Sequence, residues 1–206
     1  TKDVTLETMI DHSKSVRPGV KKSLMVVDMP YNTYRNSKEA LKNVKLVMKK
    51  TKCDAVKLEG GKKIIPIVKL LIKNKIPVMG HLGILPQTEK KFSFKGQKLA
   101  ERNRILKDAQ LLEKAGIFSV VLECVETKLS KIITETLKVP TIGIGASVHC
   151  DGQVLVTDDL IGLSEKRFRF VKKYESTPKL INSAVKKYKS EVIKRQFPKA
   201  KHSFKN

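Results

Sequence analysis

The stretch Ala55-Val56-Lys57-Leu58-Glu59-Gly60-Gly61 decides the fold, together with the two segments that follow it. After this short apolar run comes a helical pattern from Ile64 to Ile72, and then a second run, Ile76-Pro77-Val78-Met79-Gly80-His81. A strand, a helix and another strand in this order are typical of a βα unit, whose strands are parallel. The sequence therefore predicts an α/β fold built on a parallel sheet.

Four further apolar runs extend this pattern in both directions along the chain. They lie at residues 24–27, 119–122, 140–145 and 153–156. Helical patterns separate or follow them at residues 37–50, 99–115, 129–137 and from 164 onward, with Ser37 as an expected N-cap and Gly116 as an expected helix stop. The runs are short and continuous, as expected for strands that are buried on both faces.

The composition raises nucleic acid as a partner, but the distribution of charge argues against specific recognition. The 206 residues carry a formal net charge of +23, yet only 7 of the 43 basic residues are Arg, and the Lys are spread along the whole chain. Base and phosphate recognition relies on the bidentate guanidinium group, so a solvated basic surface is favoured over a nucleic-acid face.

The cysteine pattern and the hydropathy of the chain indicate where the protein is located. Cys53, Cys124 and Cys150 are odd in number and far apart, which excludes a disulfide framework and a CxxC metal knuckle and fits a reducing cytoplasm. No apolar run approaches the roughly 18 residues of a membrane-spanning helix. We therefore expect a cytoplasmic protein with no membrane partner.

Polar side chains recur at the ends of the apolar runs, at Asp28, Glu59, His81, Glu123 and Asp151. In a parallel architecture the carboxyl ends of the strands meet at one rim, where active sites are assembled. We expect Asp28, Lys57, Glu59, His81 and Glu123 to lie at the ends of five consecutive strands and to face one cavity.

Lys57 and Glu59 are the most informative pair, because strand alternation places them on the same face, about 7 Å apart. The structural alternative is a buried ion pair between them, although the following Gly60-Gly61 leaves space for a ligand. Asp28 could equally be a turn former or a helix cap. Together with Glu59, however, it supplies two carboxylates of the kind that Mg²⁺ prefers.

The sequence signal is less specific at three further residues, for which a structural role is an alternative to a chemical one. Glu123 at the mouth of a barrel could act as a general base or merely cap a turn. His81 could donate a hydrogen bond to a substrate carboxylate or carbonyl, or be structural. Cys124 is interpreted as a small buried side chain rather than a nucleophile.

The segment Gly143-Ile144-Gly145-Ala146-Ser147-Val148 begins like a dinucleotide-binding fingerprint. It lacks the third glycine, because position 148 is Val, and it comes late in the chain. We expect its glycines to open space for a ligand or a loop rather than to bind NAD.

Five ordered motifs resemble the ketopantoate hydroxymethyltransferase family, and the resemblance covers essentially the whole chain. They are Asp28-Met29-Pro30, Val56-Lys57-Leu58-Glu59-Gly60-Gly61, Gly80-His81-Leu82-Gly83-Ile84-Leu85-Pro86-Gln87, Leu122-Glu123-Cys124-Val125 and Ile142-Gly143-Ile144-Gly145-Ala146. The segments Asp151-Gly152-Gln153-Val154-Leu155-Val156 and His202-Ser203-Phe204 fit as well.

The resemblance implies a Mg²⁺-dependent (β/α)8 TIM barrel. It implies transfer of a hydroxymethyl group from the co-substrate 5,10-methylenetetrahydrofolate to 3-methyl-2-oxobutanoate, giving 2-dehydropantoate for pantothenate biosynthesis through a Mg-stabilised enolate. By this resemblance Asp28 and Glu59 are the metal ligands and Glu123 is the general base. Lys57 is a substrate-binding residue, as we also expect of Asp28 and His81.

Two departures from the family pattern add expectations. The family begins with two further βα units, the first ending in an Asp-Ser pair whose Asp also serves the metal, and Thr1 to Val20 match the stretch after them. We therefore expect residues 1–206 to form a single, partial barrel domain that lacks these units, and to assemble into a homo-oligomer. At Ser147 and Val148 the family usually has Gly and Asn.

Two alternatives remain open from the sequence. An incomplete barrel could be weakly active or inactive and be kept as a binding or assembly protein. The charge of +23 and the Lys-rich C-terminal region leave a basic nucleic-acid-binding protein as a less favoured reading.

Overall fold

The computed structural model describes residues 3–89, 93–165 and 168–204, and the chain divides into two compact units. The first unit, Thr1–Val154, contains a parallel sheet with its helices. The second unit, Leu155–Asn206, contains the helices α6 and α7. The single domain expected over residues 1–206 stays a prediction.

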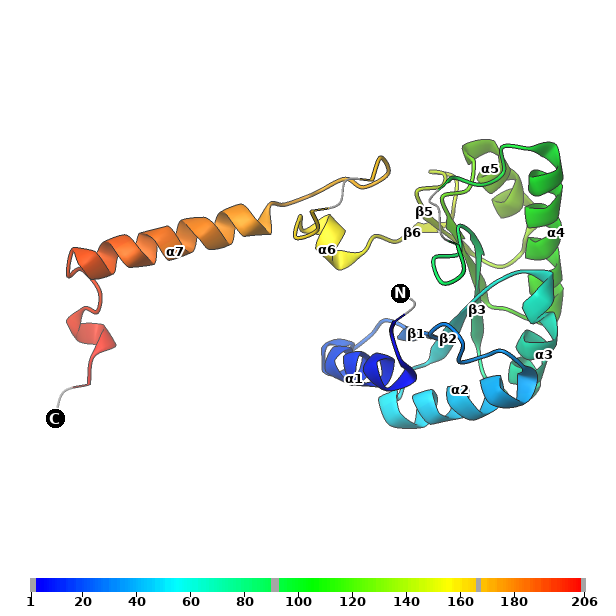
Figure 1. The fold of residues 1–206 in the computed structure, drawn as a ribbon, viewed down its shortest axis with the longest axis horizontal. Helices are drawn as coiled ribbons and strands as arrows, with labels where there is room; N and C mark the ends of the chain where they lie inside the picture. The colour runs from blue at the N-terminus through cyan, green and yellow to red at the C-terminus, as the bar shows by residue number, and fades with distance from the viewer. Residues whose placement is uncertain (1–2, 90–92, 166–167, 205–206) are drawn as a thin grey trace. The chain divides into compact units, whose positions relative to one another are not determined.

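Six parallel strands form the sheet, in the spatial order β1-β2-β3-β4-β5-β6. Their bounds are β1 Val26–Asp28, β2 Ala55–Glu59, β3 Val78–Gly83, β4 Ser119–Glu123, β5 Thr141–Ile144 and β6 Gly152–Gln153. Because each connection moves to the next strand in the same direction, the sheet does not reverse as in a doubly wound fold. It curls instead into a half-barrel (Figure 1).

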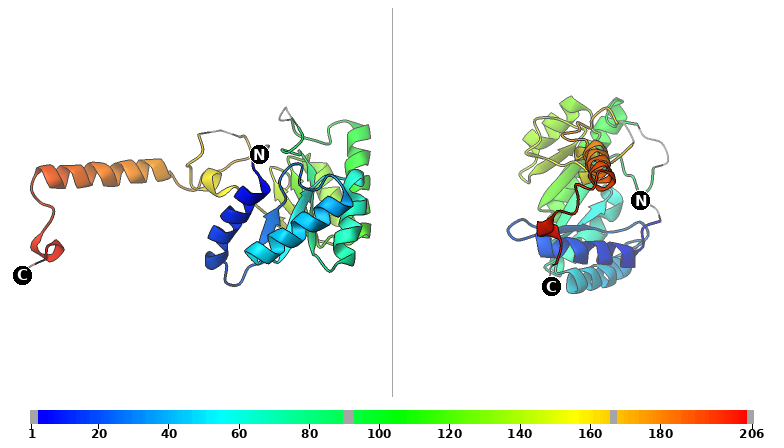
Figure 2. Two further views of the ribbon diagram at one scale, coloured as in Figure 1. Left: turned by 60° about the horizontal axis from the view of Figure 1, so that its bottom comes forward. Right: turned by 90° about the vertical axis from the view of Figure 1, so that its left-hand side faces the viewer.

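The helices of the first unit cover the outer face of this curled sheet. They are α1 Leu6–Val16, α2 Ser37–Thr51, α3 Ile65–Lys73, α4 Leu99–Ala115 and α5 Thr127–Thr136, with short 3-10 turns η1 at Arg17–Gly19 and η2 at Lys62–Ile64. Helices α2 to α5 follow one another around the outside of the strands, and α1 packs against α2 (Figures 1 and 2). The inner face is left for the polar side chains.

Alternation along each strand separates the core from this inner face. Val56, Leu58, Val120 and Leu122 point outward and are fully buried in the core beneath the helices. The helices contribute apolar stripes at helical spacing, which in α2 consist of Ala40, Val44 and Val47. Burying these side chains contributes about 1.5–3 kcal/mol for each large one.

Six strands were expected, and the described part of the chain contains six, but several boundaries differ. The first strand begins at Val26, where its pairing with Ala55 begins, rather than at residue 24, whose side chain is 70% exposed. The sixth ends at Gln153, since the chain makes its last ladder bond from Val154 N to Gly143 O and then leaves the sheet. Helix α1 was not predicted.

Helix ends follow local capping chemistry. The predicted N-cap of α2, Ser37, is wrong by one residue, since the Asn36 side chain accepts a hydrogen bond from Glu39 N. Gly116 ends α4 with a positive φ of 100°, which confirms the predicted helix stop.

The second unit consists of α6 Thr157–Leu160, α7 Thr177–Ile193 and the 3-10 turn η3 Ala200–His202. The helix expected from residue 164 onward begins only at Thr177, where Pro178 lies in the first turn and suits a helix start. No residue of α7 is buried, although Leu180, Ile181 and Tyr188 are apolar. Among the described residues, no helix is long and apolar enough to span a bilayer.

Gly83 provides a test of the close strand packing. Its φ is +101°, and a Cβ at this position would overlap the carbonyl oxygen of Glu123 on the neighbouring strand. We expect Gly83→Ala to lower the free energy of unfolding by about 2–4 kcal/mol, through backbone strain and this overlap. Urea unfolding measures the change.

The matched control is Gly19→Ala, because Gly19 is exposed and a Cβ at its position would meet no other atom within 4 Å. This variant should unfold within about 0.5 kcal/mol of the parent. Equal stability of the two variants would contradict the close packing at Gly83.

Candidate active site

The five predicted site residues lie on four neighbouring strands, with their side chains toward the inner face. Asp28 ends β1, Lys57 and Glu59 belong to β2, His81 to β3, and Glu123 ends β4. The prediction that they lie on five strands is thus wrong by one, because Lys57 and Glu59 share a strand. Parallel register places Asp28 beside Lys57 and Glu59 beside His81.

Four of these side chains form a continuous series of contacts across the four strands. Lys57 Nζ lies 2.9 Å from Asp28 Oδ2 and 3.0 Å from His81 Nδ1. His81 Nε2 lies in turn 3.2 Å from Glu123 Oε2. The structural alternative of a Lys57–Glu59 ion pair is wrong, since Lys57 makes its ion pair with Asp28.

These contacts fix the tautomer of His81. An ammonium group has only donors, so Lys57 must donate to Nδ1, and the ring proton of a neutral imidazole is then carried by Nε2. The ring is only 3% exposed, while the side chains of Lys57 and Glu123 are each 18% exposed. A rigid N–H donor thus lies beside two groups that a ligand can reach.

Two buried side-chain atoms in the described part of the chain have no hydrogen-bond partner, and both belong to this site. They are Asp28 Oδ1 and His81 Nε2. His81 Nε2 lies 3.2 Å from Glu123 Oε2 but without the alignment of a hydrogen bond. Buried polar atoms without partners are rare in folded proteins, so this pair marks a place where a ligand would bind.

Glu59 is held by residues that sequence reasoning did not include in the site. Its Oε2 accepts a hydrogen bond of 3.1 Å from Gln87 N, and its own backbone N donates to Tyr34 Oη at 3.3 Å. Tyr34 Oη donates to Gln87 Oε1 at 2.7 Å, and Gln87 Nε2 donates to Met29 O at 2.9 Å. The network ties the ends of β1 and β2 to the segment after β3.

Burial dominates the electrostatics of this network. It raises the pKa of the Glu59 carboxyl, and His81, the Gln87 N–H and Lys57 lower that pKa by less. Burial likewise raises the pKa of the Tyr34 phenol well above its usual range, so Tyr34 serves as a neutral donor. Gln87 belongs to one of the five family motifs, but its role depends on a long-range contact that sequence spacing does not show.

The residues present fit a magnesium ion in one specific respect. Asp28 Oδ1 is a buried oxygen without a partner, and Glu59 is a second, largely buried carboxylate nearby on the same face. Among the described residues no group of three or more His, Cys, Asp or Glu could hold a metal. Two carboxylates suffice for Mg²⁺ when water and substrate oxygens complete its shell.

Other residues singled out from the sequence are structural. Cys124 is buried, and burial together with the Glu123 charge raises its thiol pKa to about 12, which leaves it protonated and inert near neutral pH. Gly143 faces the Gln153 side chain on β6, so its missing Cβ serves strand packing. Asp151 accepts hydrogen bonds from Thr141 N and Oγ1 at the start of β5, away from the site.

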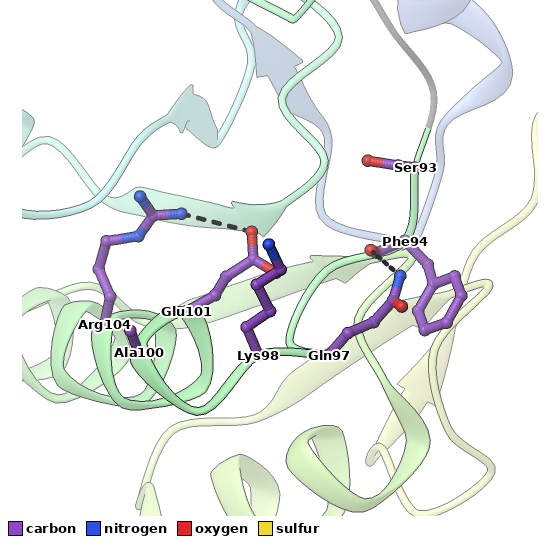
Figure 3. Close-up of a pocket in the computed structure, with 7 residues that line it drawn as sticks. All are labelled: Ser93, Phe94, Gln97, Lys98, Ala100, Glu101 and Arg104. Atoms are coloured by element: carbon purple, nitrogen blue, oxygen red, sulfur yellow. Dashed lines mark hydrogen bonds and ion pairs between the residues drawn. The ribbon is translucent and has the colours of Figure 1, made fainter.

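A cavity of about 710 Å³ adjoins the site, with Glu59 in its wall. A second pocket of about 570 Å³ lies at the start of α4 and contains none of the five site residues (Figure 3). In that pocket Gln97 Nε2 donates to Phe94 O, and Arg104 lies 3.6 Å from Glu101. Because Glu59 lines the first cavity, that cavity is the one joined to the chemistry.

Comparison with known proteins identifies several relatives. Residues 1–200 match the family model for ketopantoate hydroxymethyltransferase. The chain is 69% identical to the 3-methyl-2-oxobutanoate hydroxymethyltransferase of Pelagibacter ubique (strain HTCC1062), over 99% of this chain and 79% of that protein. It is 44% identical to the enzyme of the same name from Rhizobium etli, over 98% and 76% of the two chains.

The fold is shared more widely than the sequence. The solved structure of "a putative phosphonomutase from Burkholderia cenocepacia J2315" aligns with a TM-score of 0.51 over 93% of this chain and 79% of that one, at 12% identity. At this identity the likeness concerns the fold alone, and it agrees with the curled parallel sheet.

The raised pKa of Glu59 makes a prediction about stability. A carboxyl with a higher pKa in the folded than in the unfolded protein destabilises the fold once ionised, at pH above the folded value, and this effect disappears below the unfolded value near 4.5. In metal-free buffer, Glu59→Gln should therefore melt at a higher temperature than the parent near neutral pH. The difference should shrink as the pH falls toward 4.

Glu135→Gln is the control, because Glu135 is exposed and makes only a 3.7 Å surface pair with Lys131. Its melting temperature should stay close to that of the parent at every pH. Calorimetry that finds Glu59→Gln less stable than the parent at neutral pH would refute the assignment of desolvation as the dominant effect.

Proposed function

Because the chain belongs to the ketopantoate hydroxymethyltransferase family, we propose that it transfers the one-carbon unit of 5,10-methylenetetrahydrofolate to 3-methyl-2-oxobutanoate. The product is 2-dehydropantoate, and the reaction serves pantothenate biosynthesis. The observation that carries the proposal is the pair of unpartnered buried atoms, Asp28 Oδ1 and His81 Nε2, beside the carboxylate of Glu123.

Substrate binding is assigned to the cations and donors of the contact series. The keto acid carries a carboxylate and a carbonyl, both of which are hydrogen-bond acceptors. Lys57 Nζ and the Nε2–H of His81 are the donors on the inner face that suit them, and Asp28 orients Lys57 through the 2.9 Å ion pair. A charged ammonium held by a carboxylate on one side can still bind an anion on the other.

Glu123 is the proposed general base. Its carboxylate is partly exposed at the end of β4, where it can accept the C3 proton of the bound keto acid. The electron pair of the broken C–H bond then forms an enolate. Water hydrolyses the methylene bridge of the folate, which breaks its two C–N bonds and releases tetrahydrofolate and the one-carbon unit as formaldehyde. The enolate C3 attacks the formaldehyde carbon, and the resulting alkoxide takes a proton from Glu123. His81 lies between Lys57 and Glu123 and keeps the base at a fixed distance from the substrate-binding ammonium.

Asp28 and Glu59 are the residues that would hold Mg²⁺. When bound, this ion supplies positive charge that stabilises the negative charge developing on the oxygens of the keto acid, as in a Mg-stabilised enolate. Gln87 and Tyr34 keep the Glu59 carboxylate oriented through their hydrogen bonds.

The alternatives are less well supported than catalysis. A barrel kept only for assembly has no need to bring five polar side chains of four strands onto one face, at the expense of burying Glu59. A nucleic-acid-binding role rests on net charge alone, and charge without a built surface gives only weak, salt-sensitive binding.

Oligomeric state and location remain part of the proposal. We expect a homo-oligomer, which the exposed apolar side chains of α7 support, because such side chains are usually covered by a partner. We expect a cytoplasmic location, in agreement with three free and buried cysteines.

The general-base role predicts the behaviour of one substitution. Glu123→Gln should slow Mg²⁺-dependent deuterium exchange at C3 of 3-methyl-2-oxobutanoate by about 10²- to 10⁴-fold, because an amide cannot accept the proton. The exchange is followed by NMR without folate. Removal of Mg²⁺ with EDTA should also suppress it.

Two comparisons separate the base from the metal ligand. Calorimetric titration should show nearly unchanged Mg²⁺ and keto-acid binding in Glu123→Gln, but weaker Mg²⁺ binding in Glu59→Gln. Unchanged exchange in Glu123→Gln would move the base to another residue, and a complete lack of exchange in the parent protein would refute the proposed function.

A further inference from the structure

The main chain directly after the proposed base is held by a residue from the segment between β3 and α4. Lys95 N donates to Cys124 O at 2.8 Å, and Lys95 O accepts from Glu126 N at 2.8 Å. These two bonds make Lys95 the parallel bridge partner of Val125, outside the six strands of the sheet. Lys95 therefore extends the main-chain pairing past the end of β4, where Glu123 lies.

The turn that follows Glu123 has a backbone conformation that a residue with a side chain rarely adopts. Cys124 has a φ of +50°, in the left-handed region. Such strain persists only where the surrounding structure enforces it, and it is concentrated at functional sites. The N–H of Cys124 donates to Ile144 O at 2.8 Å and its C=O accepts from Lys95 N, so Lys95 is one of the two main-chain contacts that hold this conformation.

The ammonium group of Lys95 anchors this main chain through an ion pair. Lys95 Nζ lies 2.6 Å from Glu89 Oε2, and the two side chains are 15% and 27% exposed. The surface pair of Lys131 with Glu135 has a distance of 3.7 Å and side chains that are 48% and 62% exposed. Because partial burial reduces screening by solvent, the Lys95–Glu89 pair contributes more than such a surface pair.

Other contacts hold the neighbouring helices independently of the Lys95 side chain. Glu126 is the N-cap of α5, and Arg102 of α4 donates to its carboxylate at 2.7 Å. Gly96 N donates to Glu101 Oε2 at 2.7 Å at the start of α4. Loss of the Lys95 ammonium group should therefore leave α4 and α5 in place and allow the protein to fold.

The groups assigned to substrate and metal binding belong to β1, β2 and β3. They are Asp28, Lys57, Glu59 and His81. Their contacts run among these strands, to Gln87 and to Glu123, and none of these contacts involves Lys95. A change in the Lys95 side chain should therefore act on the base rather than on binding.

We propose that Lys95 is a positioning residue for the general base. Its main chain holds the turn at Cys124 that directs the Glu123 carboxylate, and its ion pair with Glu89 keeps that main chain in place. Lys95 acts through Glu123 rather than on the substrate. This assignment rests on the proposed function, because it takes Glu123 as the base, and it adds the contact that fixes the position of that base.

The variant Lys95→Met tests the assignment, because it removes the ammonium group and keeps a side chain of similar length. We expect it to slow deuterium exchange at C3 of 3-methyl-2-oxobutanoate by roughly 10- to 100-fold, since a small displacement of a catalytic group has an effect of this size. Titrations with Mg²⁺ and with the keto acid should give nearly the Kd values of the parent.

Two rescue variants separate positioning from a general loosening of the fold. Lys95→Arg and the reversed pair Glu89→Lys/Lys95→Glu both retain an ion pair, and each should restore most of the exchange rate. Amide hydrogen exchange adds a measurement that needs no substrate. The Glu126 N–H, which donates to Lys95 O, should exchange faster in Lys95→Met and be protected again in both rescue variants.

The matched control is Lys131→Met, because Lys131 lies on α5 and makes only the exposed pair with Glu135. It should match the parent in both kinds of exchange. The assignment is overturned if Lys131→Met is as slow as Lys95→Met, if Lys95→Met loses Mg²⁺ and keto-acid binding together with its rate, or if neither rescue variant restores the rate.

The parent protein keeps this assignment apart from the proposed function. If the parent exchanges deuterium at C3 and Lys95→Met does so equally fast, Lys95 has no positioning role and the proposed function stands. If the parent catalyses no exchange, the proposed function is wrong, and so is the assignment of a base that Lys95 would position.

Discussion

The Lys57 ammonium is the group on which the arrangement of the site depends. It contacts Asp28 on one neighbouring strand and His81 on the other, so it joins three strands of the sheet on the inner face. Its donation to Nδ1 decides which nitrogen of His81 carries the proton, and His81 in turn lies against Glu123 on a fourth strand. One cation thereby sets the orientation of the substrate donors and the position of the base.

The positions of these groups follow from the alternation and the register of the parallel strands. The residues of β2 that point outward, Val56 and Leu58, are fully buried against the helices, so Lys57 and Glu59 must point inward. Such burial offsets the cost of holding a carboxylate like Glu59 away from water. The same buried carboxylate also lies in the wall of the cavity that adjoins the site.

Much of this could be predicted from the sequence, because it depends on local pattern. The apolar runs indicated the six strands, and the polar residues at their ends indicated four of the five members of the candidate site. Lys57 followed from its alternation with Glu59 on one strand, whereas Asp151 lies away from the site. The features that the sequence did not predict depend on contacts between distant segments. Lys57 pairs with Asp28 rather than with Glu59, two residues away on its own strand, and Tyr34 and Gln87 reach Glu59 from connecting segments. The late start of α7 at Thr177 was missed because a basic, weakly periodic segment precedes it.

The tautomer of His81 tests the central role of Lys57 most directly. Nitrogen-15 NMR of the histidine side chains, recorded on the ligand-free protein near neutral pH, distinguishes a protonated from an unprotonated ring nitrogen. The contact between Lys57 and His81 predicts an unprotonated Nδ1 and a proton on Nε2 in the parent protein, and a mixture of tautomers in Lys57→Met. A proton on Nδ1 in the parent, or the same spectrum for His81 in both proteins, would contradict this account.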